Sequence, residues 1–296
     1  MPHPPPSPAL AIVVSRMTYA RGVRAMLRVQ QVSVASEPGN PGVRNDDWAG
    51  ATASGIAVVV DGVTESGETG CVHGTAWYVH QLGSRIIASA GTRARTLADS
   101  LAEAIAEVRA GHGGGCDLSH PGSPAATVAA LRVRDDVVEY LVLSDAVVVL
   151  DTGPEPLVVT DPSARLALPE LAADAARGTQ TLATLIEAQQ RLRNRPGGYW
   201  LAQHDPQAAA HALTGSVANV DGAVLLTDGA ALLVTDFGAI SWRELLDVVY
   251  ASGPAGLLAA TREVELRDAS RTVWPRYKTH DDATAIALRF ATSAGG

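Results

Sequence analysis

Blocks of short apolar strands alternate with pairs of amphipathic helices along this sequence, and that order limits the fold to a few layered architectures. We expect strands at 27–35, 56–60, 125–133, 137–143, 147–151, 212–220, 223–227 and 283–290. The apolar periodicity predicts helices at 72–90, 96–110, 164–176, 181–193, 241–251 and 255–268. Strand blocks that alternate with helix pairs favour antiparallel sheets covered by helices over a series of βαβ units.

Local patterns within these segments predict further details. The alternation of apolar residues changes phase at Gln30-Gln31, which predicts a β-bulge in the first strand. The short segments Arg134-Asp135-Asp136 and Ser144-Asp145-Ala146 separate neighbouring strands and suit tight hairpins. Ser241, followed by Glu244, has the pattern of a capping box at the start of a helix.

The composition is that of a chain that can bury a large core but does not suit a polyanionic partner. Apolar residues make up 47% of the 296 residues, and the formal net charge is −8 without a basic run. Such a surface repels phosphate backbones, so nucleic acid is not expected as a partner. No apolar run is long enough to span a membrane. We therefore expect no membrane partner and a cytoplasmic location.

The N-terminal segment differs in composition from the rest of the chain. Residues 1–26 are Pro-rich at the start and precede the first convincing strand. We expect this segment to be a disordered tail, or an artefact of an upstream start codon, since Met17 and Met26 are alternative starts. The folded domain is expected to span 27–292.

Acidic residues lie beside the ends of three predicted strands and just before a further strand region. They are Asp46-Asp47, Asp61-Gly62, Asp228-Gly229 and Asp281-Asp282. One such step alone is usually a turn, but converging carboxylates about 4 Å apart repel by roughly 4 kcal/mol per pair at an effective dielectric constant near 20. Either such a cluster does not form, or it holds cations, and all-oxygen donors select hard ions such as Mg²⁺ or Mn²⁺.

Taken in order, these motifs resemble those of the metal-dependent protein phosphatases of the protein phosphatase 2C (PPM) type. The matching segments are 45–47, 58–62, 126–130, 144–145, 225–229 and 281–284. The resemblance covers about residues 28–291 and implies an α+β fold, an αββα four-layer sandwich of two antiparallel sheets flanked by helix pairs. Residues 27–292 would then be a PPM-type phosphatase domain.

The resemblance also implies ligands for two Mg²⁺ or Mn²⁺ ions. The matching positions are Asp46, Asp47, Asp61, Gly62, Asp145, Asp228 and Asp281. Asp61 would bridge the ions, the Gly62 carbonyl would help to hold one of them, and Asp228 and Asp281 would complete the shell of the other. Asp145 matches an Asp that is sometimes linked to a third ion. Asp61, Asp228 and Asp281 are thus the candidate catalytic residues, with Arg44 as the candidate for binding phosphate.

The implied activity is that of a phosphoric monoester hydrolase. A metal-activated water would hydrolyse phosphomonoesters, namely phosphoserine and phosphothreonine in proteins. Some positions depart from the family pattern: Asp46 replaces Glu, Val63 stands where some members carry His, and 144–147 lacks the Gly and Arg of the Gly-Asp-Ser-Arg turn. The alternatives are a small phosphorylated metabolite as the substrate, or a catalytically weak or inactive module that binds or regulates.

The remaining histidines offer weaker candidates. His73 and His80 share one face of the helix expected at 72–90, and a metal site there would need a third ligand. His280 precedes Asp281 and could support the ligands or act as a general acid, although an exposed loop histidine is commoner.

The cysteines and the single lysine are given no functional role. Cys71 and Cys116 are too few for a disulfide scaffold or a four-cysteine zinc site, and His112 with Cys116 has no zinc spacing. We interpret both thiols as unreactive. Lys278 is the only lysine among 23 basic residues, which we attribute to codon bias.

Overall fold

Two antiparallel five-stranded sheets form the centre of the computed structural model, which describes residues 26–293. The first sheet has the order β1-β10-β9-β6-β7 and comprises β1 (Met26–Glu37), β6 (Val147–Asp151), β7 (Leu157–Val159), β9 (Gly222–Leu226) and β10 (Ala283–Ser293). The second has the order β2-β3-β4-β5-β8 and comprises β2 (Asp47–Ala51), β3 (Ile56–Gly62), β4 (Ala126–Arg134), β5 (Val137–Leu143) and β8 (Leu213–Ala218). The tail predicted at 1–26 lies, apart from Met26, outside the described residues.

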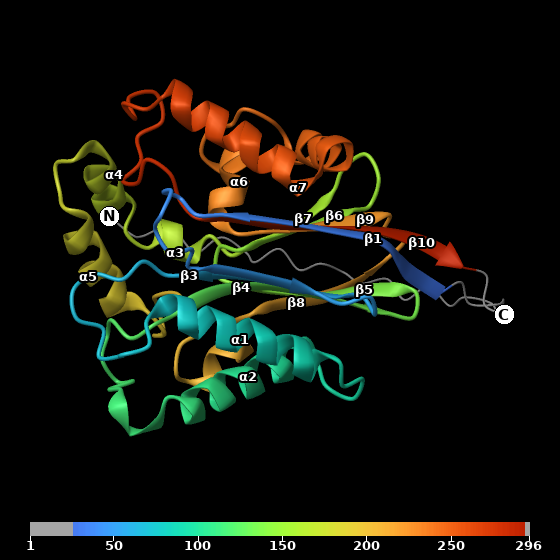
Figure 1. Ribbon diagram of the computed structural model, residues 1–296, viewed down its shortest axis with the longest axis horizontal. Coiled ribbons are helices and arrows are strands. Elements are labelled where there is room, and N and C mark those ends of the chain that lie inside the picture. The colour runs from blue at the N-terminus through green and yellow to red at the C-terminus, as the bar shows by residue number, and fades with distance from the viewer. Residues whose placement is uncertain (1–25, 294–296) are drawn as a thin grey trace, which may run out of the picture.

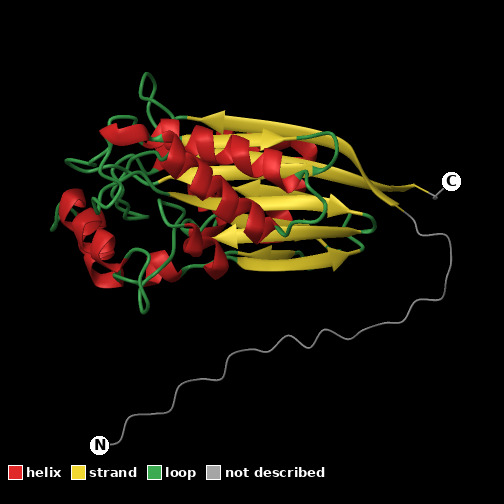
Figure 2. Ribbon diagram, turned by 90° about the horizontal axis from the view of Figure 1, so that it is seen from below, coloured by secondary structure: helices red, strands yellow, loops and turns green. Residues whose placement is uncertain are grey.

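Each sheet is covered on its outer face by helices, so the molecule has four layers (Figure 1). Helices α1 (Thr75–Ala90) and α2 (Leu97–Gly111) cover the sheet of β3 and β4, as Figure 2 also shows. Helices α6 (Asp228–Thr235) and α7 (Trp242–Arg267) cover the sheet of β9 and β10. The predicted αββα four-layer sandwich is therefore confirmed.

The alternation of side chains along β3 explains why two apolar layers meet on this strand. Ile56, Val58 and Val60 pack against α1 and α2, whereas Ala57 and Val59 face the other sheet. Both sets are buried, which is why the strand reads as a continuous apolar run.

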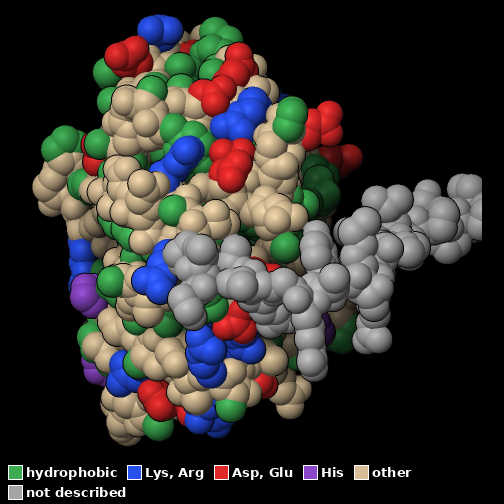
Figure 3. Space-filling model, turned by 90° about the vertical axis from the view of Figure 1, so that its right-hand side faces the viewer, with side chains coloured by type: hydrophobic (Ala, Val, Ile, Leu, Met, Phe, Trp, Pro, Cys, Tyr) green, Lys and Arg blue, Asp and Glu red, His purple; other side chains and the backbone are tan. Residues whose placement is uncertain are grey.

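Short helices fill the connections. They are α3 (Ser163–Leu166), α4 (Pro169–Arg177), α5 (Leu182–Leu192) and the 3₁₀ helices η1 (Gly113–Gly115) and η2 (Pro206–His211). Helices α3 to α5 gather at one end of the sandwich, on the left in Figure 1. At the opposite end, acidic and basic side chains are interspersed over the described surface (Figure 3). None of the helices between residues 26 and 293 combines the length and apolar content needed to cross a membrane.

Several local predictions are confirmed. The register of β1 against β10 shifts between Val29 and Gln31, where the phase change predicts a bulge. Ser241 and Glu244 form both bonds of a capping box at the start of α7. The segment 134–136 joins β4 and β5, which pair as an antiparallel hairpin.

Other local predictions are wrong because tertiary pairing overrides local turn chemistry. Asp61-Gly62 is not a turn: both residues pair with β4 inside β3. Asp228-Gly229 begins α6, and 144–146 crosses from one sheet to the other because β5 and β6 belong to different sheets.

The predicted helix boundaries also need correction. The first helix begins at Thr75 because residues 72–74 lie in a loop, and the helix predicted at 164–176 is divided between α3 and α4, with Pro169 at the start of α4. The two helices predicted at 241–251 and 255–268 are confirmed, because α7 consists of two helical segments joined at a kink, where Gly253 has a non-helical backbone and Pro254 follows.

Candidate metal centre

Carboxylates from four separate elements meet at one cavity. Asp61 lies near the end of β3, Asp145 in the crossover between β5 and β6, Asp228 at the start of α6, and Asp281 just before β10. All four line a cavity of about 100 Å³. The structure thus brings together these four residues from segments up to 220 positions apart in the chain (281 − 61).

Two glycines allow the elements to approach this closely. A Cβ on Gly62 would collide with the Thr75 side chain and the Asp46 carbonyl oxygen. A Cβ on Gly229 would collide with the Asp282 carbonyl oxygen. The glycine of each Asp-Gly step therefore serves close packing beside the acidic residue, whereas sequence reasoning assigned it to a turn.

Asp47 belongs to the same cluster although it does not line the cavity. It pairs with Asp61 across β2 and β3, so the two residues are direct cross-strand neighbours. The Thr227 hydroxyl donates to Asp47 Oδ2 at 2.9 Å, while Oδ1 is buried without a hydrogen-bond partner among the described residues. A buried carboxylate oxygen with a free lone pair is a natural cation ligand.

Burial and mutual repulsion raise the pKa values of these carboxyl groups. Burial is the largest cause of the increase in each pKa, and neighbouring acids add to it, whereas hydrogen bonds from Thr284 and Thr227 act to lower the Asp47 pKa. The pKa of Asp47 rises to about 8 and that of Asp228 to about 7, and that of Asp61 is well above its usual value. A divalent cation would offset this repulsion and favour the ionised forms.

These donors fit Mg²⁺ or Mn²⁺. The ligand atoms are all carboxylate or carbonyl oxygens, which suit hard cations, and one of them is a buried, unpartnered oxygen. Within residues 26–293, no three carboxylates bring their oxygens within 4.8 Å of one another, so the cluster is wider than the donor set around one ion.

A lysine that sequence reasoning attributed to codon bias lies inside this cluster. The ammonium of Lys278 donates to Asp281 Oδ1 at 2.6 Å, and the side chain lines the cavity. Burial acts to lower the pKa of Lys278, but Asp281, Asp228 and Asp61 together raise it. The structure thus gives the only lysine of the chain a contact that the codon-bias interpretation did not assign, as a charge partner of the acidic cluster.

Other predicted site residues lie at the margin. Asp46 is half-buried, and its carboxyl pKa is raised by burial and by Asp282 and Glu65. Arg44 is exposed and near enough to lower that pKa, but it lines neither cavity.

Asp282 has a structural role beside the candidate ligands. Its Oδ1 accepts from the backbone N–H of Gly39 and its Oδ2 from that of Asp46, both at 2.7 Å. These bonds hold the β1–β2 connection against the start of β10.

A second cavity of about 370 Å³ adjoins the cluster and shares Asp145, Asp228 and Asp281 with it. It lies against α3 and α4, and its cationic lining residues are Arg165, Arg276 and Lys278. Burial raises the Asp145 pKa, and the positive charge of Arg165 is near enough to act in the opposite direction. Sequence reasoning did not single out Arg165, since it comes from a separate short helix.

His73 and His280 both lie outside the helices and contact other polar side chains. His73 is not on the first helix with His80: it lies before Thr75, in contact with Cys71 and Cys116. His280 places Nδ1 at 2.6 Å from the buried Glu265 carboxylate.

The αββα sandwich, with acidic residues gathered at one end of its two sheets, is the arrangement of a known class of protein fold. The chain has the fold of the PPM-type metal-dependent phosphatases, as the resemblance implies. It is similar to the catalytic domain of the serine/threonine phosphatase PstP in complex with two manganese ions, with 14% identity and a TM-score of 0.55 over 90% of this chain and 99% of that one. No protein-family model and no curated protein matches the sequence.

Two further solved structures show the same fold. PppA, a regulatory component of the type VI secretion system of Pseudomonas aeruginosa, has 15% identity and a TM-score of 0.54 over 88% of this chain and 97% of that one. The PPM Ser-Thr phosphatase MsPP of Mycobacterium smegmatis, in complex with cacodylate, has 17% identity and a TM-score of 0.51 over 88% and 99%.

Proposed function

We propose that this chain is a metal-dependent phosphatase that hydrolyses phosphomonoesters, with phosphoserine and phosphothreonine of proteins as its substrate class. The observation that carries the proposal is the meeting of Asp61, Asp145, Asp228 and Asp281 at one cavity. The fold shared with Ser/Thr phosphatases supports the same activity.

In this proposal the acidic residues bind the metal ions and a basic residue binds the phosphate. Asp61, Asp228 and Asp281 would hold Mg²⁺ or Mn²⁺, with Asp47 and the Gly62 carbonyl beside them. Such ions supply an activated water and neutralise charge on the phosphoryl oxygens. Arg165 lines the larger cavity and would bind the phosphate there, in exchange for its present two-bond pair with Asp236 at 3.1 and 3.2 Å.

The first experiment tests metal-dependent turnover. The full chain is assayed with p-nitrophenyl phosphate in Mn²⁺, in Mg²⁺ and in EDTA. We expect turnover only with metal, and a loss of at least about 100-fold in Asp61→Asn and Asp228→Asn. Asp247→Asn, which changes an exposed carboxylate on α7, is the matched control and keeps the wild-type rate. Equal turnover in EDTA, or full activity in Asp228→Asn, would contradict the proposal.

A second experiment asks which arginine binds phosphate. We expect Arg165→Ala to raise KM for p-nitrophenyl phosphate about 10-fold or more, while Arg44→Ala changes it little, because Arg44 lines neither cavity. The opposite result would return the phosphate-binding role to Arg44.

The larger cavity gives the alternative substrate class a structural basis. Its volume of about 370 Å³ is within the range of small-molecule sites, and three cationic side chains line it. Comparing kcat/KM for phosphothreonine peptides with that for sugar phosphates separates a protein substrate from a small phosphorylated metabolite.

Lys278 favours a second candidate function, a catalytically weak or inactive module that binds or regulates. Its ammonium already neutralises Asp281, so part of the acidic charge is balanced by the chain itself. For this candidate we expect no turnover with any ion and no Mn²⁺ binding by calorimetry.

A further inference from the structure

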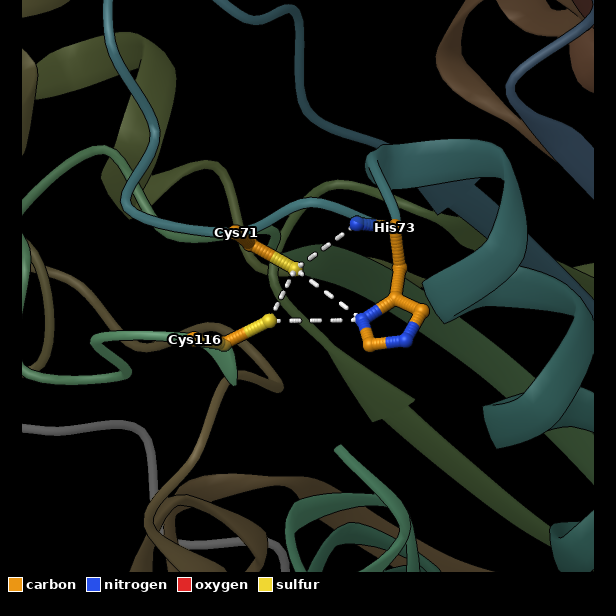
Figure 4. Close-up of side chains that lie close together, drawn as sticks. All are labelled: Cys71, His73 and Cys116. Atoms are coloured by element: carbon orange, nitrogen blue, oxygen red, sulfur yellow. Dashed lines mark hydrogen bonds between the residues drawn. The ribbon is translucent and has the colours of Figure 1, made fainter. Parts of the chain in front are cut away.

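Two cysteines and a histidine, none of which lines the cavity of the acidic cluster, lie close together (Figure 4). Cys71 Sγ lies 3.4 Å from Cys116 Sγ, and His73 Nδ1 lies 3.7 Å from the first sulfur and 3.3 Å from the second. In the described part of the chain, this is the only set of three His, Cys, Asp or Glu side chains whose donor atoms all lie within 4.8 Å of one another.

These separations match the edges of a tetrahedral zinc site. Zn–S bonds of about 2.3 Å and Zn–N bonds of about 2.05 Å at tetrahedral angles place sulfur about 3.8 Å from sulfur and about 3.6 Å from nitrogen. The three observed separations of 3.4, 3.3 and 3.7 Å each lie within about 0.4 Å of those values. The donor atoms therefore need only small movements to surround one ion.

We propose that Cys71, His73 and Cys116 bind a structural Zn²⁺ ion. Two thiolates with an imidazole form a soft donor set, which selects Zn²⁺ over the hard Mg²⁺ and Mn²⁺ expected at the carboxylates. Binding requires the thiol protons to leave and the imidazole proton to sit on Nε2, so that Nδ1 presents its lone pair. All three residues are only partly buried, which gives the ion a path from solvent.

The surroundings orient these donors. The backbone N–H of His73 points to Cys71 Sγ at 3.4 Å, a contact that stabilises a thiolate. The His73 ring stacks on Trp77 with a centroid distance of 4.2 Å, which fixes the plane of the ring.

His112 is the candidate for a fourth donor. The His112 ring packs edge-on against the His73 ring at 5.4 Å between centroids. Its Nδ1 is 2.8 Å from the Val108 carbonyl oxygen, and its Nε2 is buried without a partner among residues 26–293. A histidine whose Nδ1–H donates to a carbonyl leaves Nε2 free as a ligand, so we assign His112 as the candidate fourth ligand, although its nitrogens do not lie within 4.8 Å of all three donors and its ring must move toward the ion.

The ion would join two connections of the fold. Cys71 and His73 end the loop between β3 and α1, whereas Cys116 follows α2 and η1. One backbone hydrogen bond already links these segments, from the N–H of Asp117 to the carbonyl of Gly70 at 2.7 Å. A zinc ion would add a cross-link between residues 43 and 45 positions apart, so its role is to stabilise the loop.

Measuring the metal content of the protein tests the proposed zinc site directly. The full chain is stripped with a chelator and reconstituted with Zn²⁺ or Co²⁺ under reducing conditions. We expect about one tightly held Zn²⁺ per chain by mass spectrometry, and a thiolate-to-cobalt charge-transfer band with the visible bands of a tetrahedral ion. The unfolding midpoint should rise with Zn²⁺ concentration.

Variants assign the ligands. Cys71→Ser, Cys116→Ser and His73→Gln should each lower zinc affinity at least about 10-fold, whereas His80→Gln on the exposed side of α1 should leave it unchanged. His112→Gln should weaken zinc and shift the cobalt spectrum, and an unchanged spectrum would remove it as a ligand. Because Asp228→Asn alters only the carboxylate cluster, its zinc content should stay at the wild-type value whether or not the chain is a phosphatase.

Three results would overturn the proposal. They are a cobalt spectrum without thiolate bands, wild-type zinc affinity in both cysteine variants, and a protein that contains a Cys71–Cys116 disulfide and takes up no zinc after reduction. If a cysteine variant fails to give a native circular-dichroism spectrum, the cobalt spectrum of the unaltered chain decides the question alone.

Discussion

Replacing Lys278 with Met should tighten Mn²⁺ binding at the carboxylate cluster. The ammonium lies 2.6 Å from Asp281 Oδ1, so an ion that uses this oxygen must first displace it. A hydrogen bond between charged groups contributes about 1.5–3 kcal/mol, and the lower end applies because 29% of the lysine side chain is exposed. At about 1.4 kcal/mol per tenfold change, Lys278→Met should lower the Kd for Mn²⁺ by about 10-fold.

Isothermal titration calorimetry of the metal-free full chain measures this change. Arg191→Met is the matched control, because it removes one positive charge from an exposed side chain of α5 that lies 3.9 Å from Glu187. Screening at physiological salt should keep the Kd of this control within about twofold of wild type. Equal or weaker Mn²⁺ binding by Lys278→Met would refute the reasoning that the lysine competes with the ion.

Three further predictions concern stability. Tyr78→Phe should lower the free energy of unfolding by about 1–2 kcal/mol in urea titrations, since the buried hydroxyl donates to the Gln203 carbonyl at 2.7 Å; an unchanged midpoint would contradict this. Gly83→Ala should destabilise by about 1–3 kcal/mol despite the higher helix propensity of Ala, because a Cβ would collide with the Trp48 ring, and a gain in stability would show that the ring moves freely. Asp268→Asn should lower the melting temperature. Burial acts to raise the Asp268 pKa, but hydrogen bonds from three backbone N–H groups outweigh it and lower the pKa to about 2, so the ionised carboxylate stabilises the fold. The difference in melting temperature between the variant and the wild type should persist above about pH 4 and shrink as the pH falls toward 2.

The sheet architecture could be predicted because local patterns and tertiary structure agree there. The apolar run of β3 is buried on both faces, and the capping box of α7 needs only its own first turn. Helix α6 was missed because its Asp-Gly start has the pattern of a turn. The reason for Gly229 there is the close approach of the Asp282 carbonyl, which is a tertiary contact that local sequence does not encode.

The candidate site was partly predictable for a similar reason. Asp residues at the ends of strands indicate that their carboxylates lie close together, because neighbouring antiparallel strands begin and end on the same two sides of a sheet. Lys278 and Arg165 were missed because they reach the cavities from a loop and from the short helix α3, whose positions beside the strand ends depend on tertiary packing. One signal was present: a single lysine among 23 basic residues, three positions before a predicted ligand.

The two proposed metal sites differ in a way that makes them separable within one chain. The cluster around Asp61 offers hard oxygen donors, and the cluster around Cys71 offers soft sulfur and nitrogen donors, so each discriminates against the ion of the other. Both are connected to the same loop, which leaves β3 after Gly62 and enters α1 at Thr75. Fixing the far end of this loop through zinc would restrict the conformations available to its near end. Removal of zinc should therefore loosen the loop without removing a single oxygen donor from the carboxylate cluster.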